Sequence, residues 1–256
     1  MKLATWNLNS IRAREDRLLR WLAAVGPDVV CLQELKVTED AFPSDTLQAL
    51  GYRATVHGQR TYNGVAILSR AEPEEVERGF GDGGDDLQAR LVAARVGGVR
   101  VVSAYVPNGG EVGSDKWAYK LEWLRRLRAF LDRRFAKGDL VAVGGDMNVA
   151  PEARDVYDPP AWEKTVLFHP EARAALESVR AWGLVDGFRL HHQAPGFYTW
   201  WDYRMLAFPK NRGLRIDHVF LSEPLAAKCT SALIDRQERK GKQPSDHAPV
   251  IVDLDV

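Results

Sequence analysis

The chain has 256 residues, enough for one large domain or two small ones, and 45% are hydrophobic, as in globular proteins with a full core. Basic and acidic residues both number 35, so the net charge of zero gives no argument for a nucleic-acid partner, which would need local basic patches. The first residues become polar too early for a signal peptide, no apolar run is membrane-spanning, and Cys31 and Cys229 lie far apart in apolar contexts, so we expect a soluble cytoplasmic protein with reduced thiols.

The first segments predict a strand, a helix and a second strand. Residues 2–9 alternate weakly and end with Asn7 and Asn9, which share a face as i and i+2. Ser10 is expected to cap a helix that a Gly-Pro pair ends at 26–27. Residues 28–34 predict a buried strand ending in Glu34; a Glu34 that merely reaches solvent is the alternative.

The middle of the chain predicts mainly strands. Residues 38–50 are expected to form a loop and a short helix, and strands follow at 52–57, 64–69, 75–80, 88–96 and 99–105. The acidic, glycine-rich segment 81–86 lacks the spacing of a phosphate-binding loop and predicts a turn. Tyr105 ends the last of these strands, where packing is the commoner role for a tyrosine.

A long amphipathic helix is expected from about residue 114 to 137, with its arginines on a solvated face. The apolar run 140–143 then predicts a buried strand, and Gly144 and Gly145 are expected to allow a tight turn at its end. Asp146 and Asn148, two residues apart, should project together at a strand end, where α/β enzymes place their chemistry. A simple Asx turn is the alternative.

The last third predicts a loop at 150–168, a helix at 170–182 and strand-like segments near Tyr198, at 216–221 and at 249–254. No linker, low-complexity tract or repeat is visible. We therefore expect one α/β domain, residues 1–256, with two mixed sheets packed face to face between two layers of helices.

Polar side chains gather at the predicted strand ends and beside the last strand: Asn7, Glu34, Asp146, Asn148, Asp217, Asp246 and His247. Hard oxygen donors with one imidazole suit a hard divalent cation, whereas cysteines and histidines are too few for a structural zinc site. A histidine after an aspartate is usually surface or core filler. A second acid that holds the ring would reverse this, and Asp217 is the candidate partner of His247.

Eight short segments stand in one order along the chain: TWNLN at 5–9, LQE at 32–34, GVAI at 64–67, YVPNG at 105–109, GDMNVAP at 145–151, WWDYR at 200–204, NRGLRID at 211–217 and SDHAPV at 245–250. This order resembles the exonuclease III family of bacterial AP endonucleases, within the endonuclease/exonuclease/phosphatase superfamily, over essentially the whole chain. The GDMN and SDH segments fit the wider superfamily, and WWDYR and NRGLRID narrow the resemblance to its DNA-repair branch.

The resemblance implies a four-layer, DNase I-like α/β sandwich. It also implies Mg²⁺- or Mn²⁺-dependent hydrolysis of the phosphodiester 5′ to abasic sites, with 3′→5′ exonuclease and 3′-end-cleaning activity on duplex DNA. The expected partner is double-stranded DNA with abasic sites or blocked 3′ ends, met near the nucleoid by a monomer that binds no membrane. Two alternatives remain: a non-catalytic nucleic-acid-binding regulator of the same fold, and a phosphatase of the wider superfamily.

The resemblance also implies roles for single residues. Asp146 would orient or deprotonate the attacking water, and Asn148 would hydrogen-bond the phosphate or Asp146. His247, held by Asp217, would contact a phosphate oxygen, and Tyr105 would stabilise the transition state or protonate the leaving oxygen. The implied metal ligands are Glu34 first, then Asn7, Asp146, Asn148, Asp246 and His247.

DNA contacts are expected from the segment around residues 200–216. By motif position, the predicted pocket residues are Trp200, Leu214 and Ile216, and the predicted phosphate contacts are Arg204, Arg212 and Arg215. A second basic group lies at 236–242. Solvated surface is the alternative for any single arginine, and affinity that falls with salt would support the DNA-binding prediction.

Overall fold

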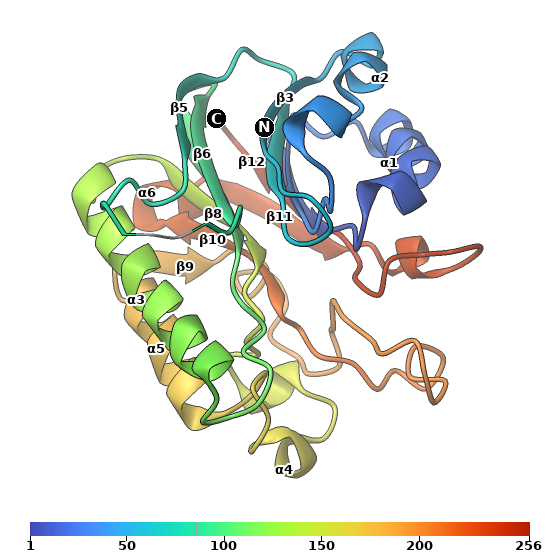
Figure 1. Ribbon diagram of the computed structural model, residues 1–256, viewed down its shortest axis with the longest axis vertical. Helices are drawn as coiled ribbons and strands as arrows, with labels where there is room; N and C mark the ends of the chain where they lie inside the picture. The colour runs from blue at the N-terminus through green and yellow to red at the C-terminus, as the bar shows by residue number, and fades with distance from the viewer. Residues whose placement is uncertain (85–86) are drawn as a thin grey trace.

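The computed structural model describes residues 1–84 and 87–256; Asp85 and Asp86, the end of the predicted turn at 81–86, lie outside the described residues. The described residues form two six-stranded mixed sheets (Figure 1). The first sheet has the order β11 (Cys229–Ile234), β12 (Val250–Leu254), β1 (Lys2–Asn7), β2 (Val29–Gln33), β4 (Val65–Ser69), β3 (Arg53–His57). The second has the order β5 (Glu74–Arg78), β6 (Leu91–Val96), β7 (Val99–Tyr105), β8 (Val141–Asp146), β10 (Asp217–Ser222), β9 (Leu184–Asp186).

Helices cover the outer face of each sheet. In Figure 1, α1 and α2 lie on one side of the sandwich, and α3 and α5 lie on the other. The predicted four-layer α/β sandwich is therefore confirmed. The α-helices are α1 (Ile11–Val25), α2 (Ser44–Ala49), α3 (Asp115–Arg134), α4 (Pro159–Trp162), α5 (Pro170–Arg180) and α6 (Glu223–Ala226), and the 3₁₀ turns are Glu39–Ala41, Ala153–Asp155 and Arg236–Arg239.

The alternation of side chains along each strand sorts the residues between two cores. In β1, Ala4 and Trp6 pack beneath α1, whereas Leu3 packs between the two sheets. Successive side chains of a strand point to opposite faces, so Thr5 and Asn7 also belong to the inter-sheet side. The polar end of β1 is therefore directed toward the second sheet.

The two glycines before Asp146 have a role that differs from the predicted turn. Gly144 and Gly145 both lie inside β8, which continues to Asp146. A Cβ on Gly145 would lie 1.9 Å from the carbonyl oxygen of Ala104, and one on Gly144 would lie 3.1 Å from Cys31 Sγ. The glycines therefore permit close approach of the neighbouring strand and of the facing sheet.

Other local predictions were also wrong. The segment near Tyr198 forms no strand; Trp200 makes isolated bridges to Leu214 and His247. Ser10 precedes α1 but makes no capping bond with its side chain, because its φ of 92° differs from that of an ordinary cap. Its N–H instead donates to the carbonyl of Glu34 at 2.8 Å, which ties the start of α1 to the end of β2.

The structure also describes the two cysteines and the apolar character of the helices. Cys31 is buried and Cys229 is half-buried, and both are free thiols. Among the described residues, the helices are too short or too polar to cross a membrane.

Candidate active site

Strand ends from both sheets meet at one edge of the sandwich. β1 and β2 run parallel in one sheet, as do β7 and β8 in the other. The C-terminal ends of these pairs carry Asn7, Glu34, Tyr105 and Asp146. β10 runs antiparallel to β8 and begins with Asp217, which pairs in register with Asp146. The predicted polar residues of distant segments therefore converge through sheet topology.

Asn7 joins the carboxylates of the two sheets. Its Nδ2 donates to Glu34 Oε1 and to Asp146 Oδ2, both at 2.9 Å. Its Oδ1 accepts the backbone N–H of Asn9 at 2.9 Å, so the amide nitrogen, and not the oxygen, faces the carboxylates.

Three side chains fit a single metal ion. One ligand atom each from Glu34, Asp146 and His247 lies within 4.8 Å of the others. Two carboxylates suit Mg²⁺ or Mn²⁺, whereas an imidazole binds a metal only through a nitrogen that carries no proton. The donor chemistry is therefore compatible with the predicted divalent cation.

His247 and Asp217 form a buried pair beside this cluster. His247 Nδ1 lies 2.8 Å from Asp217 Oδ2, and its Nε2 lies 3.9 Å from Asp146 Oδ2. Burial lowers the pKa of His247, but the charges of Asp217 and Asp146 outweigh it and raise the pKa to about 10. Asp217 Oδ1 is buried without a hydrogen-bond partner among the described residues. Asp217 thus holds the imidazole through Nδ1, and the protonated Nε2 faces Asp146.

The surroundings shift the pKa values of Asp146 and Glu34 in opposite directions. Burial, and then the charge of Asp217, raise the pKa of Asp146 to about 7, although His247 opposes this. Burial also raises the pKa of Glu34, but the ammonium of Lys36 and the hydrogen bond from Asn7 lower it overall. At neutral pH, Glu34 is therefore ionised, and Asp146 is poised to gain or lose a proton.

Tyr105 is a neutral hydrogen-bond donor at this edge. Burial, followed by the charges of Glu34 and Asp146, raises the pKa of Tyr105 well above its usual range. The guanidinium of Arg90 lies over the ring, 4.6 Å from its centroid. The phenol therefore keeps its proton at physiological pH.

Asn148 reaches Asp146 through a turn and not through an extended segment. Its φ is 48°, and its backbone N–H donates to Asp146 Oδ1 at 2.9 Å, as in an Asx turn. Its Nδ2 donates to Val106 O at 3.0 Å and lies 3.3 Å from Asp146 Oδ2, while its Oδ1 accepts from Asn108 at 3.2 Å. The Asx turn and the shared position at the strand end are therefore both present, and the turn produces the proximity.

Asp246 lies outside the three-residue cluster. Its Oδ1 accepts from Asn9 Nδ2 and its Oδ2 from Trp200 Nε1, both at 3.0 Å. The preceding Ser245 donates to the carbonyl of Asn7 at 2.7 Å and accepts from the N–H of His247 at 3.1 Å. This turn anchors His247 to the end of β1.

Sequence reasoning overlooked Lys36 beside the cluster. Its Nζ lies 2.9 Å from Glu34 Oε2 and donates to Asn9 Oδ1 at 2.5 Å. Glu34 and Lys36 both have left-handed backbone, with φ of 52° and 58°, which is uncommon outside glycine and is concentrated at functional sites. The signal in the sequence that could have indicated Lys36 was its position two residues after Glu34.

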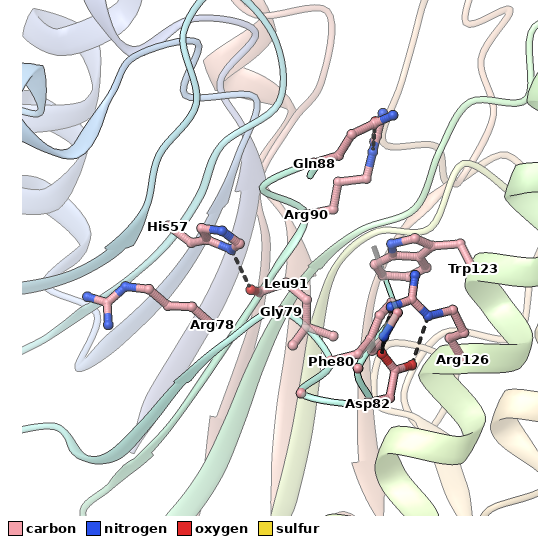
Figure 2. A pocket seen from close by; sticks show the side chains of 13 residues that line it. His57, Arg78, Gly79, Phe80, Asp82, Gln88, Arg90, Leu91, Trp123 and Arg126 are labelled. Atoms are coloured by element: carbon pink, nitrogen blue, oxygen red, sulfur yellow. Dashed lines mark hydrogen bonds and ion pairs between the residues drawn. The ribbon is translucent and has the colours of Figure 1, made fainter. Parts of the chain in front are cut away.

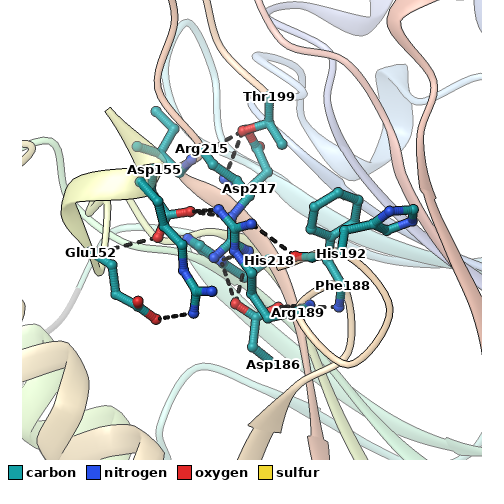
Figure 3. Close-up of polar contacts among 12 residues, drawn as sticks. Glu152, Asp155, Asp186, Phe188, Arg189, His192, Thr199, Arg215, Asp217 and His218 are labelled. Atoms are coloured by element: carbon teal, nitrogen blue, oxygen red, sulfur yellow. Dashed lines mark hydrogen bonds and ion pairs between the residues drawn. The ribbon is translucent and has the colours of Figure 1, made fainter. Parts of the chain in front are cut away.

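Three of the predicted DNA contacts are corrected by their burial. Leu214 is 0% and Ile216 2% exposed, and both pack in the core beneath α3 and α5. Arg215 is 1% exposed and donates to Asp155 and Asp186 in a buried network that also contains His218 (Figure 3). These side chains present no surface to DNA.

The other three predicted DNA contacts remain accessible. Arg204 and Arg212 are exposed and Trp200 is half-buried, whereas Trp201 is fully buried. Trp200 lies edge-on to Trp162, with 6.1 Å between the ring centroids. It helps to line an open hollow of about 420 Å³ with Asn9, Asp202, Tyr203, Arg204 and Asp246.

A second hollow, of about 610 Å³, includes Glu34 of the cluster in its lining, together with Tyr105, Lys36 and Lys116. The smaller hollow of Figure 2, about 210 Å³, contains none of the predicted site residues. There Arg126 pairs with Asp82 of the predicted turn. Glu34 of the cluster therefore lines one hollow, and Asp246, which precedes His247, lines another.

Known proteins share this architecture over its full length. Residues 4–247 match the model of the Endonuclease/Exonuclease/phosphatase family. Exodeoxyribonuclease III of Haemophilus influenzae is 36% identical over 262 aligned residues, which cover 98% of each chain. An AP endonuclease structure from Archaeoglobus fulgidus superposes with a TM-score of 0.97 at 38% identity and full coverage of both chains. A structure of the 3′ phosphatase NExo from Neisseria, bound to a product DNA hairpin, gives a TM-score of 0.95 at 40% identity, also with full coverage. The chain therefore belongs to the endonuclease/exonuclease/phosphatase family, in its exodeoxyribonuclease III group.

Proposed function

We propose that this chain is a DNA-repair nuclease that hydrolyses the phosphodiester 5′ to abasic sites and removes blocking groups and nucleotides from 3′ ends, with Mg²⁺ or Mn²⁺ as cofactor. The observation that carries the proposal is the convergence of Glu34, Asp146 and His247 within 4.8 Å. Relatives named as an exodeoxyribonuclease and an AP endonuclease support the reaction, and the hairpin-bound relative supports a DNA substrate.

The metal site we propose is centred on Glu34, and Asp146 and the protonated His247 border it. Asn7 orients both carboxylates. Asp246 lies beside them and accepts hydrogen bonds from Asn9 and Trp200. When bound, the cation would neutralise charge on the phosphoryl oxygens and favour departure of the 3′ oxygen.

The residues of the chain divide the remaining work. Asp146, with a pKa of about 7, accepts the proton of the attacking water near neutral pH. Protonated His247, held by Asp217, donates to a phosphate oxygen, where charge develops in the transition state, and the Asn148 amide hydrogen-bonds Asp146. Tyr105 carries a proton that it can give to the leaving 3′ oxygen.

An abasic nucleotide lacks a base to unstack, so it costs little to extrude. We assign its recognition to the hollow beside Trp200, and phosphate contacts to Arg204 and Arg212. We further propose that residues 1–256 act as one domain, since both sheets share the core that contains Leu3 and Val101, and that the enzyme works as a monomer on the chromosome.

The test is cleavage of an end-labelled duplex with one abasic analogue, beside a duplex with a 3′ phosphate. Each is incubated with Mg²⁺, with EDTA, and with the Asp146→Asn protein. A nick 5′ to the lesion, lost in EDTA and reduced at least about 10²-fold in the variant, is the expected result.

The pattern of products decides between the activities. Loss of the 3′ phosphate or 3′ shortening without a nick would restrict the function to end processing. Absence of all cleavage by folded, metal-loaded protein that still binds DNA would overturn the proposal in favour of a binding protein. Undiminished cleavage by the Asp146→Asn protein would move the chemistry to another site.

A further inference from the structure

A lysine of α3 is buried below the site without a carboxylate beside it. Lys120 is 0% exposed, and no acidic side chain of the described residues lies within ion-pair distance of it. Burial lowers the pKa of Lys120 to about 7, although the charge of Asp146 acts in the opposite direction. A buried ammonium without an acidic partner is costly, so its other contacts need an explanation.

Those contacts are backbone carbonyls from separate loops. Lys120 Nζ donates to Asn148 O at 2.7 Å, to Val166 O at 2.6 Å and to Asn108 O at 3.1 Å. An ammonium has three N–H donors, so each of them has an acceptor. The loops follow β7, follow β8 and precede α5, and Lys120 fastens them together.

The loop after β7 is shaped around this side chain. Gly109 has a φ of 96°, and a Cβ at this position would lie 2.9 Å from Lys120 Cδ. Any other residue would therefore push the lysine or the loop away and would be strained in this backbone conformation. The aliphatic part of the Lys120 side chain therefore packs closely against Gly109, next to Asn108.

Two of these three carbonyls belong to Asn148 itself and to Asn108, whose side chain contacts the Asn148 amide. Asn148 Oδ1 accepts from Asn108 Nδ2, and Asn148 Nδ2 faces Asp146 and Val106. Lys120 holds the backbones of Asn148 and Asn108 at once. It therefore restricts both the amide and its neighbour.

We propose that Lys120 is a positioning residue, whose buried side chain fixes Asn148 in the orientation that presents its amide to Asp146. This inference rests on the proposed function. Lys120 itself is buried and touches no substrate, so its effect passes through Asn148. Misplacement of a reacting group by about 1 Å costs on the order of 10²-fold in rate.

The first experiment compares Lys120→Met with Leu127→Ala. Both positions are fully buried on α3, and Leu127→Ala is the control because it loosens the helix but leaves the three hydrogen bonds of Lys120 in place. With both proteins assayed well below their unfolding temperatures, we expect kcat of Lys120→Met to fall about 10²-fold with KM within about twofold, and kcat of Leu127→Ala to stay near wild type. Equal losses in both variants would overturn the proposal.

A double variant tests whether Lys120 acts through Asn148. Asn148→Ala removes the amide, so adding Lys120→Met should lower kcat little further. Losses that multiply would assign Lys120 to general stability and overturn the proposal. If Lys120→Met does not fold, Gly109→Ala displaces the lysine without deleting it, and the same pattern is expected.

A readout without turnover separates this inference from the proposed function. Selective ¹⁵N-asparagine labelling reports the Asn148 side-chain amide, assigned by its loss in Asn148→Ala. We expect this resonance to move in Lys120→Met and not in Leu127→Ala, and an unmoved resonance would overturn the positioning role. An inactive wild-type protein whose resonance still responds would refute the proposed function alone.

Discussion

The Asp217–His247 pair permits a prediction about pH. Asp217→Asn removes the negative charge that contributes most to keeping His247 protonated, while the side chain keeps its size. In the unsubstituted protein the pKa of His247 is about 10, so the imidazolium persists through the neutral range and is lost only as pH rises past that value. The alkaline limb of the rate profile should therefore lie high.

The magnitude follows from the protonated fraction. If the pKa of His247 returns to its ordinary value of 6.5, only about one ring in thirty is protonated at pH 8. We expect an approximately 30-fold loss of kcat/KM at pH 8, and little loss near pH 5.5, where the ring is still charged. Asp217 also raises the pKa of Asp146, so the acid limb should move to lower pH as well.

The assay is kcat/KM between pH 5.5 and 9.5 on the abasic duplex at saturating Mg²⁺. Asp253→Asn is the control, since Asp253 lies on β12 and bonds Ser231 away from the site. Both limbs should shift toward acid in Asp217→Asn and neither in the control. A loss by the same factor at every pH would refute the electrostatic account and would leave only misorientation of the ring.

Other predictions concern metal, stability and DNA. Glu34→Gln should weaken Mn²⁺ binding, measured by calorimetry, at least about tenfold, because it removes a charged ligand; unchanged affinity would move the metal elsewhere. Asp155→Ala leaves Arg189 and Arg215 with less compensation in the interior and should lower the free energy of unfolding in urea by about 3–5 kcal/mol; a loss below about 1 kcal/mol would contradict the buried-network reasoning. Arg204→Ala combined with Arg212→Ala should reduce the slope of log affinity against log salt by about two, and an unchanged slope would assign both to solvated surface.

Local sequence patterns contained much of the architecture. Apolar runs of strand length and one long amphipathic helix predicted the two sheets and α3, because side-chain periodicity reflects which face each element buries. The strands β9 and β11 were not predicted; β9 has only three residues, and β11 is largely exposed on one face. Such segments carry too little periodic signal, and pairing with a neighbouring strand determines their conformation.

The polar residues at strand ends were also visible in the sequence, since Asp146 and Asn148 follow an apolar run directly. Their distances were not visible, because Asn7, Glu34 and Asp146 meet through parallel pairing and the packing of two sheets. The Asx turn at Asn148 was visible in the sequence as an alternative, whereas the left-handed backbone of Glu34 was not predicted.

Burial of charge was decided by the tertiary structure alone. Arg204 and Arg215 stand in similar basic stretches, yet one is exposed and the other is enclosed by Asp155 and Asp186. Lys120 lies on the apolar face of α3, and only the loops from three distant parts of the chain make that position tolerable for an ammonium. The sequence determined which groups are available, and the long-range packing determined their partners, because desolvation and Coulomb energies depend on the surroundings in space and not on neighbours along the chain.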